Sequence, residues 1–351
     1  MAEPVSSGFG IAGTGVIAAM HAAAIARLPG ARLCAITDVN AAAAAAFAAR
    51  SGVAAEPGLD ALLARDDVDV VCVCVPSGLH AEIGTRAAQA GKHLVVEKPI
   101  DVTLAAADRL ITAAREAGVA LTVISQHRFD PGLIELKQLI GDGVLGRLVL
   151  GEASTKWYRA QAYYDSAAWR GTWAMDGGSL MNQGVHYVDL LRWCLGPVTE
   201  VTAVCTTQTH RIEAEDTALA LVRFASGAVG TIMSTTAAAP GFPQRLEVTG
   251  TEGTVIVEDG RIVCRALGDQ PPTRAAPAGP EASGPEAPRP GAAADPAAIE
   301  VAAHAAQIAD LLAAIDEGRE PAVGGQDGRD TLEIVCAVYE SARTGRPVFL
   351  S

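Results

Sequence analysis

Apolar and polar residues follow two different patterns along this chain, and the change near residue 146 divides it. Before that point, short apolar runs alternate with Ala-rich segments of helical character. The runs are typical of buried strands and cover 8–12, 32–37, 68–75, 93–96 and 119–124. Helices are predicted between them at roughly 16–28, 41–50, 59–65, 79–90 and 103–117. We expect these strands, separated by helices, to form an α/β Rossmann fold with a doubly wound parallel sheet.

Beyond residue 146, consecutive β-like runs are joined by short turns with few helical connections. They cover 149–157, 198–208, 217–224, 229–235, 244–249 and 253–257. This half is predicted to be an α+β domain with a large, mostly antiparallel, open-faced sheet. Because one face of such a sheet often needs cover, we expect an oligomer.

The predicted domains are therefore 1–125, which binds a dinucleotide, and 126–351, which binds substrate and forms the oligomer. Residues 265–300 are rich in Ala, Pro and Gly, and are expected to form a mobile loop. Two helices follow, at 301–317 and about 328–344, and a closing edge strand is expected after Pro347. The pattern leaves open whether these helices pack back on the first domain.

A glycine turn joins the first strand to the first helix, and the second strand ends at an acidic residue. Gly13 suits a tight turn, Gly15 allows the backbone to approach a pyrophosphate, and Ala18 keeps the helix close to the sheet. Asp38 is placed to accept hydrogen bonds from a ribose 2′-hydroxyl and to repel a 2′-phosphate. We expect NAD rather than NADP, held in this turn by Gly13, Thr14, Gly15, Val16 and Ile17.

Further polar groups follow the later strands of the same predicted sheet. Ligands bind at the carboxyl ends of parallel strands. We therefore expect these polar residues to line a cleft rather than to be unrelated surface residues. The cofactor contacts expected from these ends are Pro76, Ser77, His80, Glu97, Lys98 and Gln126. One residue among Gln126, His127 and Arg128 is expected to bind substrate.

Composition narrows the class of protein. The 351-residue chain is 50% hydrophobic and carries a net charge of −13, which argues against nucleic-acid binding. No apolar run has the length of a membrane span, and the N-terminus has no basic signal region, so we expect a cytoplasmic protein. The seven cysteines include no CxxC pair, and neither a metal site nor disulfides are expected.

A Gly-Gly turn at Gly177-Gly178 leads into a segment of helical spacing that ends at Gly196. On such a helix Asn182, His186 and Asp189 share one face, as in a side that lines a cleft. A capped amphipathic helix with an incidental histidine explains the same spacing, and this segment alone does not decide between the two.

Two polar residues, His186 and Lys98, suit the oxidation of an alcohol. A neutral imidazole at His186 has the right affinity to take a hydroxyl proton. Lys98 follows a buried strand and precedes a proline, and its ammonium can stabilise an ionised substrate hydroxyl. Asn182 would orient the ring or bind a second hydroxyl. Asp189 would hold substrate or steer His186, and an ion pair with Arg192 is the structural alternative.

Taken together, these motifs resemble the glucose–fructose oxidoreductase / inositol dehydrogenase / MocA family. The resemblance rests on Gly13-Thr14-Gly15, Asp38, Glu97-Lys98-Pro99, and Gly177-Gly178 with His186 and Asp189. It implies NAD(P)-dependent chemistry on a sugar or cyclitol, with Lys98 and His186 as catalytic residues, and a homodimer or homotetramer formed through the C-terminal sheet. Position 182 departs from the inositol dehydrogenase pattern, which has aspartate there, and Asn182 looks more like branches that act on sugars or nucleotide sugars.

Three of the four tryptophans fall in the segment 157–173, just before the Gly-Gly turn. Aromatic faces stack on sugar rings, and arginine pairs with carboxylates or phosphates. Tyr158, Arg159 and Arg128 are the expected substrate contacts, besides Asn182 and Asp189. Hydrophobic anchoring of a long loop is an equal alternative for any one residue of this segment.

The sequence thus predicts an NAD(H)-dependent oxidoreductase that transfers hydride to or from a secondary alcohol or ketone of a sugar-like substrate. Two alternatives stay open. One is a regulator that senses a dinucleotide or sugar without turnover. The other is a sugar–sugar oxidoreductase that retains tightly bound NAD(P).

Overall fold

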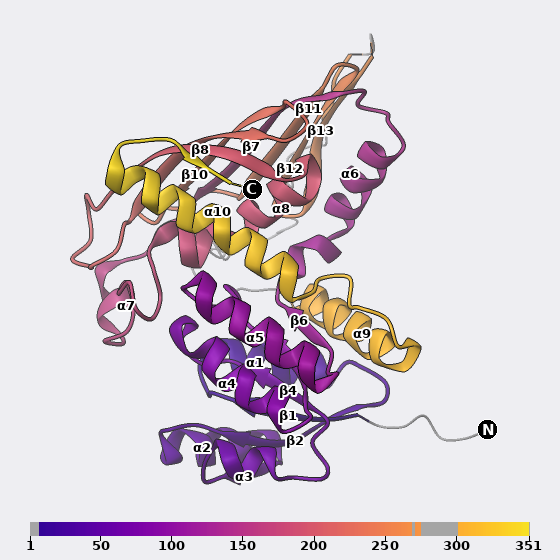
Figure 1. Ribbon diagram of the computed structural model, residues 1–351, viewed down its shortest axis with the longest axis vertical. Coiled ribbons are helices and arrows are strands. Elements are labelled where there is room, and N and C mark those ends of the chain that lie inside the picture. The colour runs from indigo at the N-terminus through magenta and orange to yellow at the C-terminus, as the bar shows by residue number, and fades with distance from the viewer. Residues whose placement is uncertain (1–6, 269–270, 275–300, 351) are drawn as a thin grey trace, which may run out of the picture. The chain divides into compact units, whose positions relative to one another are not determined.

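A computed structural model describes residues 7–268, 271–274 and 301–350 (Figure 1). The chain divides into two compact units, and each is described by itself. The first comprises 1–126 and 299–332, and the second comprises 127–298 and 333–351. The first boundary lies one residue after the predicted one, and residues 299–332 belong to the first unit. No helix in the described ranges is long and apolar enough to cross a membrane.

The first unit holds a six-stranded parallel sheet in the order β3-β2-β1-β4-β5-β6. Its order reverses between β1 and β4, which is the point where doubly wound sheets bind ligands. The predicted fold class is confirmed, although β3 was not among the predicted ranges. The strands are β1 (Ser7–Ala12), β2 (Ala31–Thr37), β3 (Ala54–Glu56), β4 (Val70–Val73), β5 (His93–Val96) and β6 (Leu121–Val123).

Helices in this unit follow the strands as predicted. Asn40 caps α2 by accepting from the amides of Ala42 and Ala43, and Thr103 caps α5 by accepting from the amide of Ala106. Gly52 and Gly118 end these two helices in the left-handed conformation. The elements are α1 (Val16–Ile25), α2 (Ala41–Ser51), α3 (Leu59–Leu63), η1 (Ser77–Leu79), α4 (His80–Gln89) and α5 (Leu104–Ala117).

The C-terminal helix α9 (Val301–Glu317) returns to this unit and packs beside α1. Ile308 and Leu311 join the core formed by β1 and β4. Gln307 is fully buried and donates to Thr122 Oγ1 (2.9 Å) and the Val123 carbonyl (2.8 Å) at the end of β6. Because a buried amide with satisfied hydrogen bonds has one favourable position, Gln307 sets the register of α9 on the sheet.

The second unit holds a nine-stranded sheet in the order β14-β13-β12-β11-β7-β10-β9-β8-β15. It is antiparallel except for the pair β7 and β10, which confirms the mostly antiparallel sheet. The strands are β7 (Leu148–Lys156), β8 (Val198–Thr206), β9 (Thr217–Phe224), β10 (Val229–Thr235), β11 (Arg245–Gly250), β12 (Gly253–Glu258), β13 (Arg261–Leu267), β14 (Thr273–Arg274) and β15 (Val348–Phe349).

Several elements here differ from the predictions. The expected loop 265–300 begins too early, because 265–267 belong to β13 and 273–274 form β14, while 269–270 and 275–300 lie outside the described residues. Two helices were missed, and the last helix starts earlier than predicted. The helical elements are η2 (Gln126–Phe129), α6 (Pro131–Gly141), α7 (Gln161–Asp165), η3 (Leu180–Gly184), α8 (Val185–Leu195) and α10 (Gly325–Thr344).

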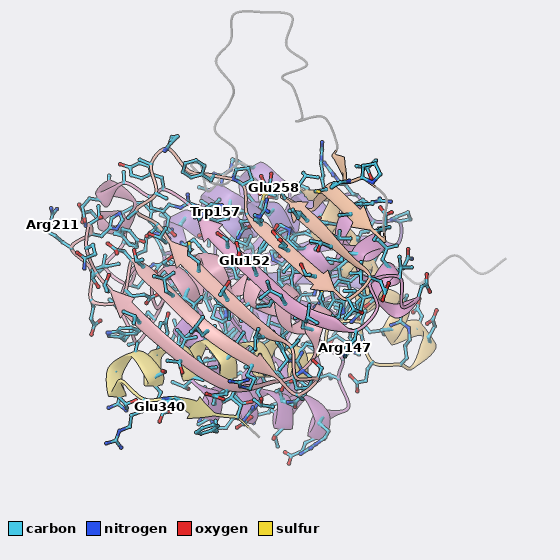
Figure 2. The ribbon with its side chains drawn as sticks, turned by 90° about the horizontal axis from the view of Figure 1, so that it is seen from above. Arg147, Glu152, Trp157, Arg211, Glu258 and Glu340 are labelled. Atoms are coloured by element: carbon cyan, nitrogen blue, oxygen red, sulfur yellow. The ribbon has the colours of Figure 1, made fainter. Side chains whose placement is uncertain are left out.

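One face of this sheet is covered by α8, α6 and η3. A Cβ at Gly151 of β7 would lie 2.7 Å from the side chain of Leu191 and 2.8 Å from that of Leu195, so glycine lets α8 approach the strand. The other face lies toward the viewer in Figure 2, with Glu152 and Glu258 on it. On β9 the alternation leaves Leu219 46% and Leu221 64% exposed on this face.

A buried carboxylate holds the Gly-Gly turn that precedes η3. Glu215 Oε1 accepts from the amide of Leu180 (2.7 Å) and from the hydroxyl of Tyr339 (3.2 Å). A Cβ at Gly178 would lie 1.9 Å from Glu215 Oε2, so only glycine fits above this carboxylate. Burial raises the pKa of Glu215 from its ordinary 4.5 to about 7.

This raised pKa predicts a pH-dependent stability. The folded chain holds the Glu215 proton more tightly than the unfolded chain. The contribution is therefore complete below about pH 4.5 and is lost as pH rises through 7, on the order of 3 kcal/mol. Glu215→Gln should remove this contribution, so its thermal midpoint relative to wild type should rise between pH 5 and pH 8. The exposed Glu213→Gln is the matched control, and the prediction fails if both variants track wild type.

Candidate functional site

The glycine turn at the switch point of the first unit is tightly packed on one side and open on the other. Gly13 has a φ of +103°, and a Cβ there would lie 2.3 Å from the carbonyl oxygen of Cys74. A Cβ at Gly15 would meet no atom within 4 Å, and Val16 is 54% exposed at the start of α1. Protein packing therefore explains Gly13 but not Gly15. The open backbone at a helix N-terminus fits the pyrophosphate of a dinucleotide.

The carboxylate at the end of β2 is held in place by the same turn. Asp38 Oδ2 accepts from the amide (2.8 Å) and the hydroxyl (2.7 Å) of Thr14, and Oδ1 accepts from the amide of Asn40 (2.8 Å). Next to it, Val39 is fully exposed, a feature that sequence reasoning missed. A fixed carboxylate beside an exposed apolar side chain fits the ribose and adenine of a nicotinamide dinucleotide.

The ends of β4 and β5 are joined through His80. Its Nδ1 lies 2.7 Å from the carbonyl oxygen of Pro99, and its Nε2 lies 2.9 Å from that of Val75. The ring is 1% exposed, and burial lowers its pKa. His80 therefore holds the two loops together, and Ser77 is also buried. Their contact with the cofactor, like that of Pro76, stays a prediction.

Glu97 and Lys98 follow β5 at the same edge of the sheet. Glu97 is 4% exposed, and its Oε1 lies 2.8 Å from Nε2 of His21 on α1. The Lys98 side chain is half-buried, while its amide donates to Glu97 Oε2 (3.1 Å). The predicted cofactor contact at Glu97 is thus a carboxylate that faces the interior. Gln126, at the start of η2, is also buried.

In the second unit, two predicted substrate contacts form an ion pair with each other. Arg128 Nε donates to Asp189 Oδ2 (2.8 Å), and its Nη2 donates to Asp189 Oδ1 (2.5 Å). Both side chains are about 5% exposed or less. The bidentate pair joins η2 to α8, and a direct contact of either residue with substrate stays a prediction.

His186 is half-buried on α8 with the His127 ring edge-on against it, at 5.2 Å between centroids. His127 Nδ1 lies 2.7 Å from Asp130 Oδ2. His127 was only one of three open choices in the sequence. Its position beside His186 depends on the packing of η2 against α8, which the sequence pattern does not encode.

The helix that carries His186 begins with a π-helical turn, η3, rather than the expected α-helical turn. Asn182 lies in this turn, and its Nδ2 donates to Oδ1 of Asp176, which is 1% exposed. The other oxygen of Asp176 accepts from the amide of Gly171 (2.8 Å). A carboxylate thus lies beside position 182, supplied by a residue that sequence reasoning did not select.

The aromatic segment anchors its own arginines. The Arg159 guanidinium is 4.9 Å from the ring centroid of Trp157 and 5.5 Å from that of Tyr163, and Arg159 is 4% exposed. Arg170 lies 4.2 Å from the Tyr163 centroid. Tyr158 is half-buried. This packing agrees with the anchoring alternative for Arg159, and the substrate contacts of Tyr158 and Arg159 stay predictions.

Comparison with known proteins agrees with this geometry. Residues 7–125 match an oxidoreductase family domain with an NAD-binding Rossmann fold, and residues 133–256 match the GFO/IDH/MocA C-terminal domain. An inositol 2-dehydrogenase of Rhizobium meliloti is 29% identical over 349 residues, covering 98% of this chain and 99% of that protein.

Among solved structures, the WlbA dehydrogenase from Bordetella pertussis, in complex with NADH and UDP-GlcNAcA, is 34% identical. It has a TM-score of 0.83, with 98% of each chain covered. A scyllo-inositol 2-dehydrogenase (NADP(+)) of Bacillus subtilis is 34% identical over 149 residues, covering 42% of this chain and 41% of that protein. The matches confirm the family expected from the motifs: the chain belongs to the Gfo/Idh/MocA family of oxidoreductases with an NAD-binding Rossmann fold.

Proposed function

We propose that this oxidoreductase is NAD(H)-dependent and transfers hydride to or from a secondary alcohol or ketone of a sugar, nucleotide sugar or cyclitol. The proposal rests on one observation: the residues expected to bind the cofactor and to act on the substrate oxygen follow strands that end at the same edge of the parallel sheet. The carboxyl ends of β1, β2 and β5 bring the Gly13–Ile17 turn, Asp38 and Lys98 to that edge. Relatives named as dehydrogenases, one of them in complex with NADH, support the same class of reaction.

The nicotinamide ring, when bound, exchanges a hydride with the carbinol carbon. Oxidation of the alcohol also releases the hydroxyl proton, and the oxygen carries negative charge before that proton is fully transferred. The protein must therefore supply a base and a cation or hydrogen-bond donor for this oxygen. We assign the base to His186 and the ammonium to Lys98. In the reductive direction His186 returns the proton.

The packing of His186 supports its role. His127 lies against the ring, and Asp130 holds His127 by a 2.7 Å contact. Asn182 is fixed through Asp176, because its amide nitrogen donates to that carboxylate. We assign Asn182 a role in orienting the His186 ring, with the Asp176 carboxylate behind it.

Lys98→Met should lower kcat by roughly 100-fold or more, because the developing alkoxide loses its charged donor. The Kd for NADH should change by less than about threefold, since the ammonium acts on the substrate oxygen. Both are measured by following NADH absorbance and fluorescence. Lys156→Met, on an exposed position of β7, is the matched control. Turnover of Lys98→Met at the wild-type rate would contradict the assignment.

Preference for NAD over NADP rests on the carboxylate that Thr14 fixes and on the sequence around it. Asp38-Val39-Asn40 contains no basic residue to pair with a 2′-phosphate. The fixed Asp38 carboxylate, in turn, would repel that phosphate. The exposed side chain of Val39 offers an apolar surface for adenine.

Asp38→Ala should therefore reduce the ratio of kcat/KM for NAD to that for NADP by about tenfold or more, mostly through a higher KM for NAD. The ratio is measured with both cofactors at saturating substrate. Asp66→Ala, an exposed acidic residue outside the glycine turn, should leave it unchanged. An unchanged ratio in Asp38→Ala would exclude the ribose contact.

A nucleotide sugar is the substrate class that we favour. Asn182 departs from the inositol dehydrogenase pattern, and the 34%-identical WlbA structure contains UDP-GlcNAcA. A panel of UDP-GlcNAcA, myo-inositol and simple aldoses, followed by NADH absorbance, separates these classes. It also separates an enzyme from the alternative of a sensing regulator, which would bind a ligand without turnover. NAD(P) retained through desalting would favour the sugar–sugar oxidoreductase.

The open face of the nine-stranded sheet supports assembly with a second copy of the chain. Leu150, Val204, Leu219, Leu221 and Val229 are each more than 40% exposed. The strand register places all five on the same face of four adjacent strands. Exposed apolar side chains gathered on one sheet face are typical of a homodimer or homotetramer interface. The cytoplasmic location expected from the sequence remains a prediction.

The double variant Leu219→Asp/Leu221→Asp should dissociate the oligomer, because it places charges at the centre of this patch. Molar mass is measured by size-exclusion chromatography with light scattering. Ile134→Asp, an exposed apolar position on α6, should keep the wild-type mass. If the double variant keeps the wild-type mass while remaining folded, the interface lies elsewhere.

A further inference from the structure

Three ionisable side chains meet in the interior of the first unit, directly behind the strand end that carries Lys98. They are His21 on α1, Glu97 after β5, and His304 on α9, which are 0%, 4% and 1% exposed. Glu97 Oε1 lies 2.8 Å from His21 Nε2 and 3.9 Å from His304 Nε2. The two imidazole rings meet edge to face, with centroids 5.7 Å apart.

The chemistry of this cluster requires that charge be balanced. An isolated carboxylate in a dry interior is strongly disfavoured, so it must be protonated or paired. Burial alone would raise the pKa of Glu97, yet the pKa is lowered to about 2, because His21, His304 and Lys98 favour its charged form. Glu97 is therefore an ionised carboxylate, and the N–H at His21 Nε2 donates a hydrogen bond to it.

The cluster also fixes the backbone on the N-terminal side of Lys98, where Glu97 Oε2 accepts from the Lys98 amide (3.1 Å). On the other side, the Pro99 carbonyl lies 2.7 Å from His80 Nδ1. Asp101, which is 3% exposed, accepts from the amide of Ala81 at the start of α4 (3.1 Å). The chain around Lys98 is thus tied to the interior while its side chain stays half-buried.

We propose that His21, Glu97 and His304 form a positioning and charge-balancing unit for Lys98. This rests on the role that the proposed function gives to Lys98. Glu97 orients the Lys98 backbone, but its charge, one residue away, would compete with the substrate oxygen for the ammonium. The imidazoles of His21 and His304 offset that charge, so the ammonium is left to act on substrate. None of the three touches substrate in this scheme, and all are positioning residues.

The same three donors form a set that transition metals use, since all lie within 4.8 Å of one another. Two ligands of one tetrahedral zinc ion lie roughly 3.3 Å apart, given bonds of about 2.0–2.1 Å. The 2.8 Å between His21 Nε2 and Glu97 Oε1 is shorter and is a normal hydrogen-bond length. The geometry therefore favours a direct hydrogen bond between His21 and Glu97 over a metal ion bound between them.

The test measures the amine of Lys98 directly, so that it does not depend on turnover. The full-length protein is labelled with acetic anhydride at pH 8, and the rate at Lys98 is compared by peptide mass spectrometry with the rate at exposed Lys156. His21→Gln keeps a hydrogen-bond donor toward Glu97 but cannot carry charge. Relative labelling of Lys98 should fall by about tenfold, because the unbalanced carboxylate retains the ammonium.

The double variant His21→Gln/Glu97→Gln removes both charges and should restore labelling to within about threefold of wild type. His304→Gln, whose ring is farther from the carboxylate, should show a smaller decrease and serves if His21→Gln does not fold. For His21→Gln, kcat on the best substrate of the panel should fall while the Kd for NADH stays constant, which a general loss of structure would not produce.

The proposal would be overturned if relative labelling of Lys98 in all folded variants equalled that of wild type. It would also be overturned if Lys98 in the double variant were labelled no faster than in His21→Gln. Stoichiometric zinc in purified protein that is lost in His304→Gln would also overturn it, in favour of a metal site. Wild-type turnover by Lys98→Met has a different meaning. It would refute the function proposed for Lys98, whereas the labelling result would still stand as a measurement of the cluster.

Discussion

A carboxylate can be buried only where the fold supplies partners for its charge, and this protein uses that constraint repeatedly to hold its functional segments. Glu97 is held by His21, Asp189 by Arg128, and Asp176 by the Gly171 amide and Asn182. The pairings of Glu97 and Asp189 join segments far apart in the chain, so they form only when those segments have packed, whereas Asp176 is held within its own turn. The side chains assigned to chemistry sit next to these anchors rather than among them.

Glu215 is the exception that clarifies the principle. Its Oε1 has hydrogen-bond partners, but its Oε2 is buried without one among the described residues, and the pKa of the carboxyl is accordingly raised to about 7. Glu97, with cationic partners, has its pKa lowered to about 2. The burial of the two groups is similar. The partners determine whether each group is held as an acid or as a carboxylate.

The first unit depends on a helix from the far end of the chain. α9 contributes Ile308 and Leu311 to the core, Gln307 to the end of β6, and His304 to the cluster behind Lys98. A Rossmann domain cut at residue 126 would therefore lack part of its core and one of the two imidazoles near Glu97. The helix α9 therefore belongs to the same compact unit as the N-terminal sheet, although the nine-stranded sheet separates them in sequence.

The sequence alone determined the features that follow from local spacing. The glycine turn, the acid after β2, the strand and helix periods, and the family pattern around Lys98 and His186 are all read from neighbouring residues, and most strand bounds followed to within two residues. Tertiary structure decided which polar groups are used for support. Arg128 and Asp189, both expected to contact substrate, pair with each other, and His80 faces two backbone carbonyls. It also brought His127 beside His186 and Asp176 beside Asn182. Such pairings depend on segments that lie far apart in the chain or on an irregular turn. Hydrophobic periodicity predicts which faces are buried, but it does not predict which polar atoms come into contact once the core has formed.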